Sequence, residues 1–143
     1  MLKKSIYVKS IKLWNECSYM DKLSVIVPCY NEEKAILLFY KEFCKIYSCM
    51  KDVEFQVIFI DDGSSDNTLN EIKKIADGDE CCSYISFSRN FGKEAALYAG
   101  LNKASGNYIA MMDVDLQDPP ILLQEMFYFI KVKRYDAVVA RRV

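Results

Sequence analysis

The chain has 143 residues, 52% of them hydrophobic, which suits one globular domain with a substantial core and argues against a disordered chain. Its 19 basic and 20 acidic residues leave a net charge of -1, which argues against a nucleic-acid-binding protein with a broad basic surface. No apolar run approaches the ~20 residues of a membrane-spanning helix, so we expect a cytoplasmic domain.

The first twenty residues do not resemble the start of a compact fold, because lysines interrupt their apolar positions. We interpret residues 1–20 as a leader, either disordered or a weak amphipathic helix that touches the domain or a membrane surface. The domain proper is expected over residues 21–143.

Five short apolar runs have the β-branched and aromatic content of buried strands. They are Leu23–Val27, Phe55–Ile60, Tyr84–Phe87, Tyr108–Met112 and Asp136–Ala140. Pro28 is expected to stop the first of them. Four segments with helical spacing alternate with these runs. The first covers about Glu32–Ser48, with Asn31 as its N-cap, and the second is capped by Ser65 or Asp66. The third is Glu94–Ala104, ended by Gly106, and the fourth begins at Pro119 and Pro120. This alternation predicts an α/β fold with a mainly parallel sheet and helices on both faces.

The unusual polar loops all follow predicted strands. They are Pro28–Glu32, Asp61–Ser65, Ser88–Lys93 and Asp113–Asp118. Because α/β sheets bind ligands outside the carboxyl ends of their strands, we expect these loops to build one composite site.

The acidic pair Asp113 and Asp115 is the clearest candidate for chemistry. Two carboxylates one residue apart at the end of a strand repel each other unless a cation, a base or full solvation compensates. Their hard oxygen atoms suit Mg²⁺ or Mn²⁺. The chain lacks both GxGxxG and GxxxxGK[ST], so a metal-assisted nucleotide-sugar site is the best remaining candidate.

Zinc is not expected. The six cysteines form no CxxC pair and the chain has no histidine. They are Cys17, Cys29, Cys44, Cys49, Cys81 and Cys82. We interpret them as reduced, small hydrophobic residues of a cytosolic protein.

Five stretches resemble the large inverting glycosyltransferase family with the A-type fold, and are most similar to its dolichyl- or polyprenyl-phosphate branch. They are Ser24–Glu33, Asp61–Asp66, Ser88–Glu94, the DXD motif Asp113–Asp115, and Asp115–Pro120. The resemblance covers about Leu23–Arg142 and implies a nucleotide-diphospho-sugar transferase fold, here truncated. It also implies a UDP- or GDP-sugar donor and a polyprenyl phosphate acceptor at the cytoplasmic face of the membrane.

The resemblance further implies roles for individual residues. Pro28, Tyr30, Asn31 and Glu32 would line the base and ribose pocket. Asp61 would accept hydrogen bonds from the base, while Asp62 and Gly63 would shape the turn. Asp113 and Asp115 would be the catalytic carboxylates and, with Gln117, would hold the metal against the diphosphate. Lys93 would approach the phosphates or the acidic site.

Simpler interpretations stand beside several of these roles. The run Asp61–Ser64 could be only a turn with helix-capping residues, and Asn31 with Glu32 only a helix start. Arg89 and Lys93 could be ordinary solvated charges. The runner-up functions are a polysaccharide or protein glycosyltransferase of the same fold, and a non-catalytic nucleotide-binding or assembly module.

The family resemblance places the acceptor-binding half and the catalytic base beyond Val143. We therefore expect this chain alone to bind a nucleoside diphosphate with metal but to transfer no sugar. An uncovered last strand also predicts marginal stability or self-association.

Overall fold

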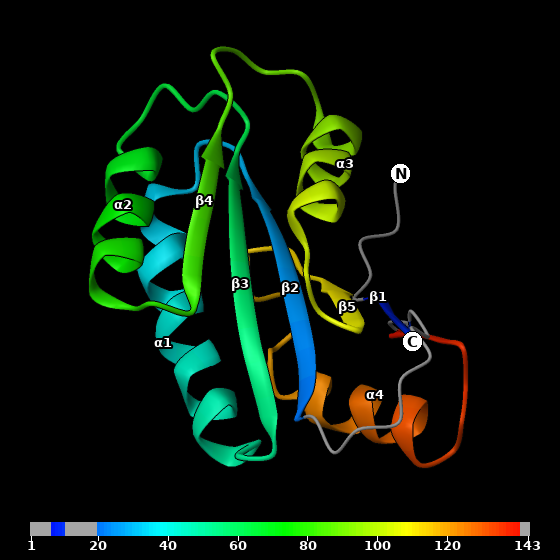
Figure 1. The fold of residues 1–143 in the computed structure, drawn as a ribbon. Helices are drawn as coiled ribbons and strands as arrows, with labels where there is room; N and C mark the ends of the chain where they lie inside the picture. Colours follow the sequence, from blue (N-terminus) through cyan, green and yellow to red (C-terminus); the bar gives the residue numbers. More distant parts are fainter. Residues whose placement is uncertain (1–6, 11–19, 141–143) are drawn as a thin grey trace.

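The computed structural model describes residues 7–10 and 20–140, which form a single sheet of six strands between helices (Figure 1). The strands are β1 (Tyr7–Ser10), β2 (Asp21–Cys29), β3 (Val53–Asp61), β4 (Cys82–Ser86), β5 (Tyr108–Met111) and β6 (Ala137–Val139). They lie in the order β4-β3-β2-β5-β1-β6. The neighbours β4, β3, β2 and β5 all pair in parallel, which confirms the predicted mainly parallel sheet.

In the part of the chain that the structure describes, four helices connect the strands. They are α1 (Glu33–Cys49), α2 (Thr68–Gly78), α3 (Lys93–Lys103) and α4 (Leu122–Lys131). In Figure 1, α3 lies on the opposite side of the sheet from α1 and α2, so the prediction of helices on both faces is confirmed. Within the described ranges, no helix combines the length and apolar character needed to cross a bilayer.

The strand sequences are almost continuously apolar because helices bury both faces of the sheet. Along β2, Val25 and Val27 join the core cluster that includes side chains of α1, α2 and α4, whereas Ile26 joins the cluster beneath α3. A Cβ atom added to Gly100 of α3 would lie 2.4 Å from Cγ2 of Ile26. The small residues of α3 therefore let its backbone approach the sheet closely.

Strand β2 continues through Pro28 to Cys29, so the expectation that this proline stops the strand is wrong. The reason is the short length of β5, which pairs with β2 only as far as Met111 beside Ile26. Met112 donates the next hydrogen bond to the Ile26 carbonyl, at 3.0 Å. Since residues two apart on a strand point their backbone polar groups to the same side, the missing N–H of Pro28 faces the β5 side, where the ladder ends. The pairing with β3 continues on the other side as far as Cys29 beside Asp61.

The sheet extends into the supposed leader. Tyr7–Ser10 forms β1, which pairs antiparallel with both β5 and β6. For these four residues the expected disordered or helical leader must be corrected, because they fill the gap between two strands whose edges would otherwise be unpaired. The rest of the predicted leader, residues 1–6 and 11–19, lies outside the described residues.

Gly106 does not end the helix before it, because α3 stops at Lys103 and Ala104 occupies the C-cap position. A Cβ atom on Gly106 would instead lie 2.7 Å from the Lys22 carbonyl oxygen and 2.7 Å from the Ser24 nitrogen. The glycine is needed for close contact with β2.

Candidate functional site

A cavity of about 420 Å³ opens at the carboxyl edge of the sheet. There Cys29 of β2, Asp61 of β3 and Ser86 of β4 lie level with one another as strand partners. The cavity is lined by Pro28, Cys29, Tyr30, Glu32, Asp62, Asn90, Gly92, Lys93, Ala96, Asp113, Val114 and Asp115. All four predicted polar loops therefore contribute to one cavity.

The predicted site residues divide into two groups. Seven of them line the cavity: Pro28, Tyr30, Glu32, Asp62, Lys93, Asp113 and Asp115. Four others, Asn31, Asp61, Gly63 and Gln117, are not among its lining residues. Sequence reasoning named no role in the site for Cys29, Asn90, Gly92, Ala96 and Val114, although all of them except Ala96 lie within stretches that carried the family resemblance.

Asp113 has an unusual environment. Its Oδ1 atom accepts a hydrogen bond from the Lys93 ammonium at 2.5 Å, so Lys93 is not simply a solvated charge. Its Oδ2 atom is buried and has no hydrogen-bond partner in the described part of the chain. Leaving such an atom unsatisfied costs about 1–3 kcal/mol or more. A hard divalent cation bound to this oxygen would remove that cost, so the donor set fits the predicted metal.

Asp115 lies two residues further along the same loop and also borders the cavity. Its Oδ1 atom accepts the backbone N–H of Gln117 at 3.2 Å. Between them Leu116 has φ of 55°, a conformation that residues other than glycine rarely adopt. Asp113 and Asp115, the pair for which the sequence predicted a cation, thus border the same cavity.

Asp62 positions the loop that precedes α3. Its two carboxylate oxygens accept the backbone N–H groups of Phe91 at 2.7 Å and Gly92 at 3.0 Å. The next residue, Lys93, is the first of α3 and reaches Asp113. Asp62 is only 4% exposed, so this carboxylate links the loop after β3 to the residues that surround Asp113.

Gly63 strengthens the same connection. Its φ is 69°, and a Cβ atom there would lie 2.3 Å from the carbonyl carbon of Arg89. Only glycine permits both the backbone angle and the contact. The loops after β3 and β4 therefore pack backbone against backbone.

Asp61 is buried, with 1% exposure. Its carboxylate accepts the Ser64 backbone N–H at 3.2 Å and the Ser86 hydroxyl at 3.1 Å. These bonds hold the turn after β3 together. Its predicted contact with a nucleotide base stays a prediction.

Asn31 is not the N-cap of α1, contrary to expectation. The helix begins at Glu33, and the Glu33 backbone N–H donates to the Asp66 carboxylate at 3.3 Å. Asn31 instead has φ of 53°, and its Oδ1 accepts the Ser65 backbone N–H at 2.9 Å, while its own N–H donates to the Ser64 hydroxyl at 3.0 Å. Its polar groups thus tie the loop after β2 to the loop after β3.

Cys29 is a buried residue that lines this acidic cavity. Burial raises the pKa of its thiol well above the usual value, and the nearby carboxylates of Asp61, Glu32 and Asp113 raise it further. A raised pKa favours the protonated thiol, which is the less reactive form.

Comparisons with known proteins agree with this geometry. The family model described as Glycosyl transferase family 2 matches residues 24–143. A relative named prophage bactoprenol glucosyl transferase homolog, from Escherichia coli (strain K12), is 48% identical over 98 residues, which are 68% of this chain and 32% of the relative. The chain thus spans about a third of the length of the curated relatives it matches.

Two solved structures extend the comparison. TarS 1-349 of S. aureus superposes with a TM-score of 0.66 at 26% identity, over 79% of this chain and 33% of that one. Glucosyl-3-phosphoglycerate synthase from Mycobacterium tuberculosis, in complex with Mn²⁺, UDP and phosphoglyceric acid, gives 0.55 at 27% identity, over 77% of this chain and 38% of that one. These likenesses agree with the predicted nucleotide-diphospho-sugar transferase fold.

Proposed function

Since this chain belongs to Glycosyl transferase family 2, we propose that its carboxyl-edge cavity binds the nucleoside diphosphate of a nucleotide-sugar donor. The observation that carries the proposal is the buried, unpartnered Oδ2 atom of Asp113, beside Asp115 and Lys93 in one cavity. A carboxylate pair and an ammonium group at a strand end suit a cation and a diphosphate together.

Asp113 and Asp115 are the proposed metal ligands, with Gln117 as a third. Mg²⁺ or Mn²⁺ bound there would neutralise the negative charge that develops on the departing diphosphate. The Mn²⁺ and UDP in the glucosyl-3-phosphoglycerate synthase structure support this assignment.

Lys93 and the start of α3 are the proposed diphosphate contacts. The N-cap residue of α3 is Gly92, which contributes no capping side chain, so the backbone N–H groups and positive dipole end of this helix suit an anion. The Lys93 ammonium already lies on Asp113 and would interact with both the metal-binding loop and a phosphate. The nucleoside would lie toward Tyr30, a cavity-lining aromatic residue with 47% exposure.

For the whole protein, we propose transfer of the sugar to a polyprenyl phosphate at the cytoplasmic face of a membrane. The support is the name of the bactoprenol glucosyl transferase relative. Because that match covers 32% of the relative, the acceptor remains part of the proposal.

Calorimetry with UDP and GDP, with and without Mn²⁺, tests the donor site. We expect metal-dependent binding of one nucleotide, weakened at least about 100-fold in Asp115→Ala because a ligand charge is removed. The thermal transition should barely move, because Asp115 borders a cavity rather than the core.

Asp77→Ala is the matched control. Asp77 is exposed on α2 and is not among the residues that line the cavity, so this variant should bind as the wild type does. Unchanged Mn²⁺-dependent affinity in Asp115→Ala would contradict the proposal.

A further inference from the structure

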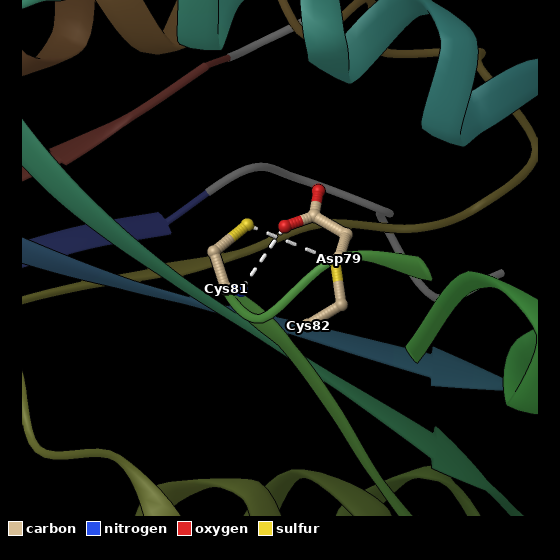
Figure 2. Close-up of side chains that lie close together, drawn as sticks. All are labelled: Asp79, Cys81 and Cys82. Atoms are coloured by element: carbon tan, nitrogen blue, oxygen red, sulfur yellow. Dashed lines mark hydrogen bonds between the residues drawn. The ribbon is translucent and has the colours of Figure 1, made fainter. Parts of the chain in front are cut away.

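Three potential metal ligands meet at the amino end of β4, outside the cavity described above. Asp79 follows α2, Cys81 comes two residues later, and Cys82 opens β4. One ligand atom from each lies within 4.8 Å of the others, and this is the one such group of three among residues 7–10 and 20–140. Figure 2 shows the two thiols and the carboxylate turned toward one another.

We propose that Asp79, Cys81 and Cys82 bind a thiophilic divalent cation of the Zn²⁺ class. The two sulfur atoms lie 3.8 Å apart. Two thiolates held at about 2.3 Å from one tetrahedral Zn²⁺ ion lie about 3.8 Å from each other. The sulfur pair therefore already has the spacing of one edge of a tetrahedral zinc site.

The carboxylate is also held in place. The Tyr40 hydroxyl of α1 donates to Oδ2 of Asp79 at 2.6 Å, and the Cys81 backbone N–H donates to Oδ1 at 3.0 Å. Hydrogen bonds of this kind orient the ligands of metal sites. A carboxylate oxygen and a thiolate sulfur bound to one tetrahedral zinc ion lie roughly 3.5 Å apart. The Asp79 oxygen and the two sulfur atoms already lie within 4.8 Å of one another, so metal binding requires a side-chain adjustment on the order of 1 Å.

The site can be reached from solvent. Asp79 and Cys81 line a hollow of about 900 Å³ at this end of the sheet, while Cys82 is buried behind them. Three protein ligands with one side open leave a fourth position for water or another small ligand. Thiolates select Zn²⁺ over Mg²⁺ or Mn²⁺, so this cation would differ from that of the nucleotide site.

The cysteine spacing argued against zinc, and the backbone explains why the argument missed this site. Adjacent residues within a strand point to opposite faces, which would separate two neighbouring thiols. Here Cys81 precedes the strand, in a turn closed by the Cys82 N–H on the Asp79 carbonyl at 3.0 Å. Both sulfur atoms therefore reach the same side.

Titration of the full chain with Zn²⁺ tests the proposal, in a phosphine reductant and with a chromophoric chelator as competitor. We expect one tightly bound equivalent, and a Co²⁺-loaded form with thiolate-to-metal charge-transfer absorption. Cys81→Ser should weaken Zn²⁺ binding at least about 100-fold and abolish the absorption, because a thiolate ligand is lost. Asp79→Asn should weaken it about tenfold.

Cys49→Ser is the matched control, since Cys49 is exposed at the end of α1 and lies outside the group. It should retain the wild-type affinity and absorption. Cys81 is only partly buried, so its variant is expected to fold, and circular dichroism with a thermal scan verifies this. Zn²⁺ should also raise the melting temperature of the wild type but not of Cys81→Ser. Zn²⁺ binding that is absent in the wild type, or unchanged in Cys81→Ser, overturns the proposal.

Discussion

The two ends of the central sheet carry different chemistry. At the carboxyl end, a cavity of about 420 Å³ is bordered by the carboxylates of Asp113 and Asp115 and by Lys93. At the amino end, a hollow of about 900 Å³ borders Asp79 and Cys81. The larger space lies away from the residues that the family resemblance identifies. The chemistry of the lining side chains therefore distinguishes these two ends better than the volume of the cavity does.

The difference has a topological origin. Parallel strands bring four loops, distant in sequence, to the carboxyl end, where backbone N–H groups of one loop donate to side-chain oxygens of another. At the amino end, the cation candidate comes from one short turn. The carboxyl end should therefore respond to changes in any of several loops, and the amino end to changes in one.

The largest effect is expected for Gly63→Ala, which attacks the contact between two carboxyl-end loops. A Cβ atom would lie 2.3 Å from the Arg89 backbone at a φ of 69°. We expect a loss of about 3 kcal/mol in the free energy of unfolding, from strain and overpacking together. Urea denaturation measures it, and nucleotide affinity should fall as well.

Gly78→Ala is the control for that variant. Gly78 ends α2, and nothing lies within 4 Å of an added Cβ atom. Its stability should stay within about 1 kcal/mol of the wild type. Equal effects for the two glycines would contradict the tight loop packing at the carboxyl end.

Lys93→Met should have the next largest effect. It removes the ammonium that lies 2.5 Å from Oδ1 of Asp113 and, in our proposal, contacts a phosphate. We expect about tenfold weaker binding of UDP or GDP with Mn²⁺, roughly 1.4 kcal/mol. Calorimetry measures it, with Lys73→Met on the exposed surface of α2 as control. Equal affinities for the two variants would remove Lys93 from the proposed site.

Asp66→Ala should reduce stability by about 1 kcal/mol at neutral pH, because Asp66 accepts hydrogen bonds from Thr68 and from the Glu33 backbone. Burial alone would raise the pKa of the Asp66 carboxyl, but these hydrogen bonds lower it below its usual value. A carboxyl with a lowered folded-state pKa stabilises the fold above its unfolded pKa of about 3.9.

That contribution is lost as the pH falls through the lower, folded-state pKa. The difference in unfolding free energy between wild type and Asp66→Ala should therefore shrink below about pH 4. Thermal scans from pH 7 to pH 3 measure it. If the difference in unfolding free energy grew as the pH fell, the folded-state pKa of Asp66 would not be lowered.

The smallest effect is expected when one end of the sheet is mutated and cation or nucleotide binding at the other end is measured. Cys81→Ser should leave Mn²⁺-dependent nucleotide binding unchanged, and Asp115→Ala should leave Zn²⁺ binding unchanged. Parallel titrations of both variants with both ions check this. Loss of both ions in either variant would show that the two ends are one coupled site.

The sequence by itself determined the chain order of β2 to β6 and of the helices between them, the parallel character of the sheet and the position of the polar loops. These follow from local properties: apolar runs, helical spacing and turn residues need no distant partner to be recognised. The acidic pair after β5 was recognisable for the same reason, since two carboxylates at a strand end repel each other within one loop.

Only the tertiary structure decided what depends on distant partners. The continuation of β2 through Pro28 rests on where β5 stops, and the place of Tyr7–Ser10 rests on two strands more than 90 residues away. Asn31 does not cap the helix that follows it, because its polar groups bond to Ser64 and Ser65 in the loop after β3. The Asp79, Cys81 and Cys82 group depends instead on the conformation of one local turn before β4, and only the Tyr40 hydroxyl on Asp79 comes from a distant residue. For β2, Tyr7–Ser10 and Asn31, the deciding contacts join segments far apart in the sequence, which no local pattern encodes.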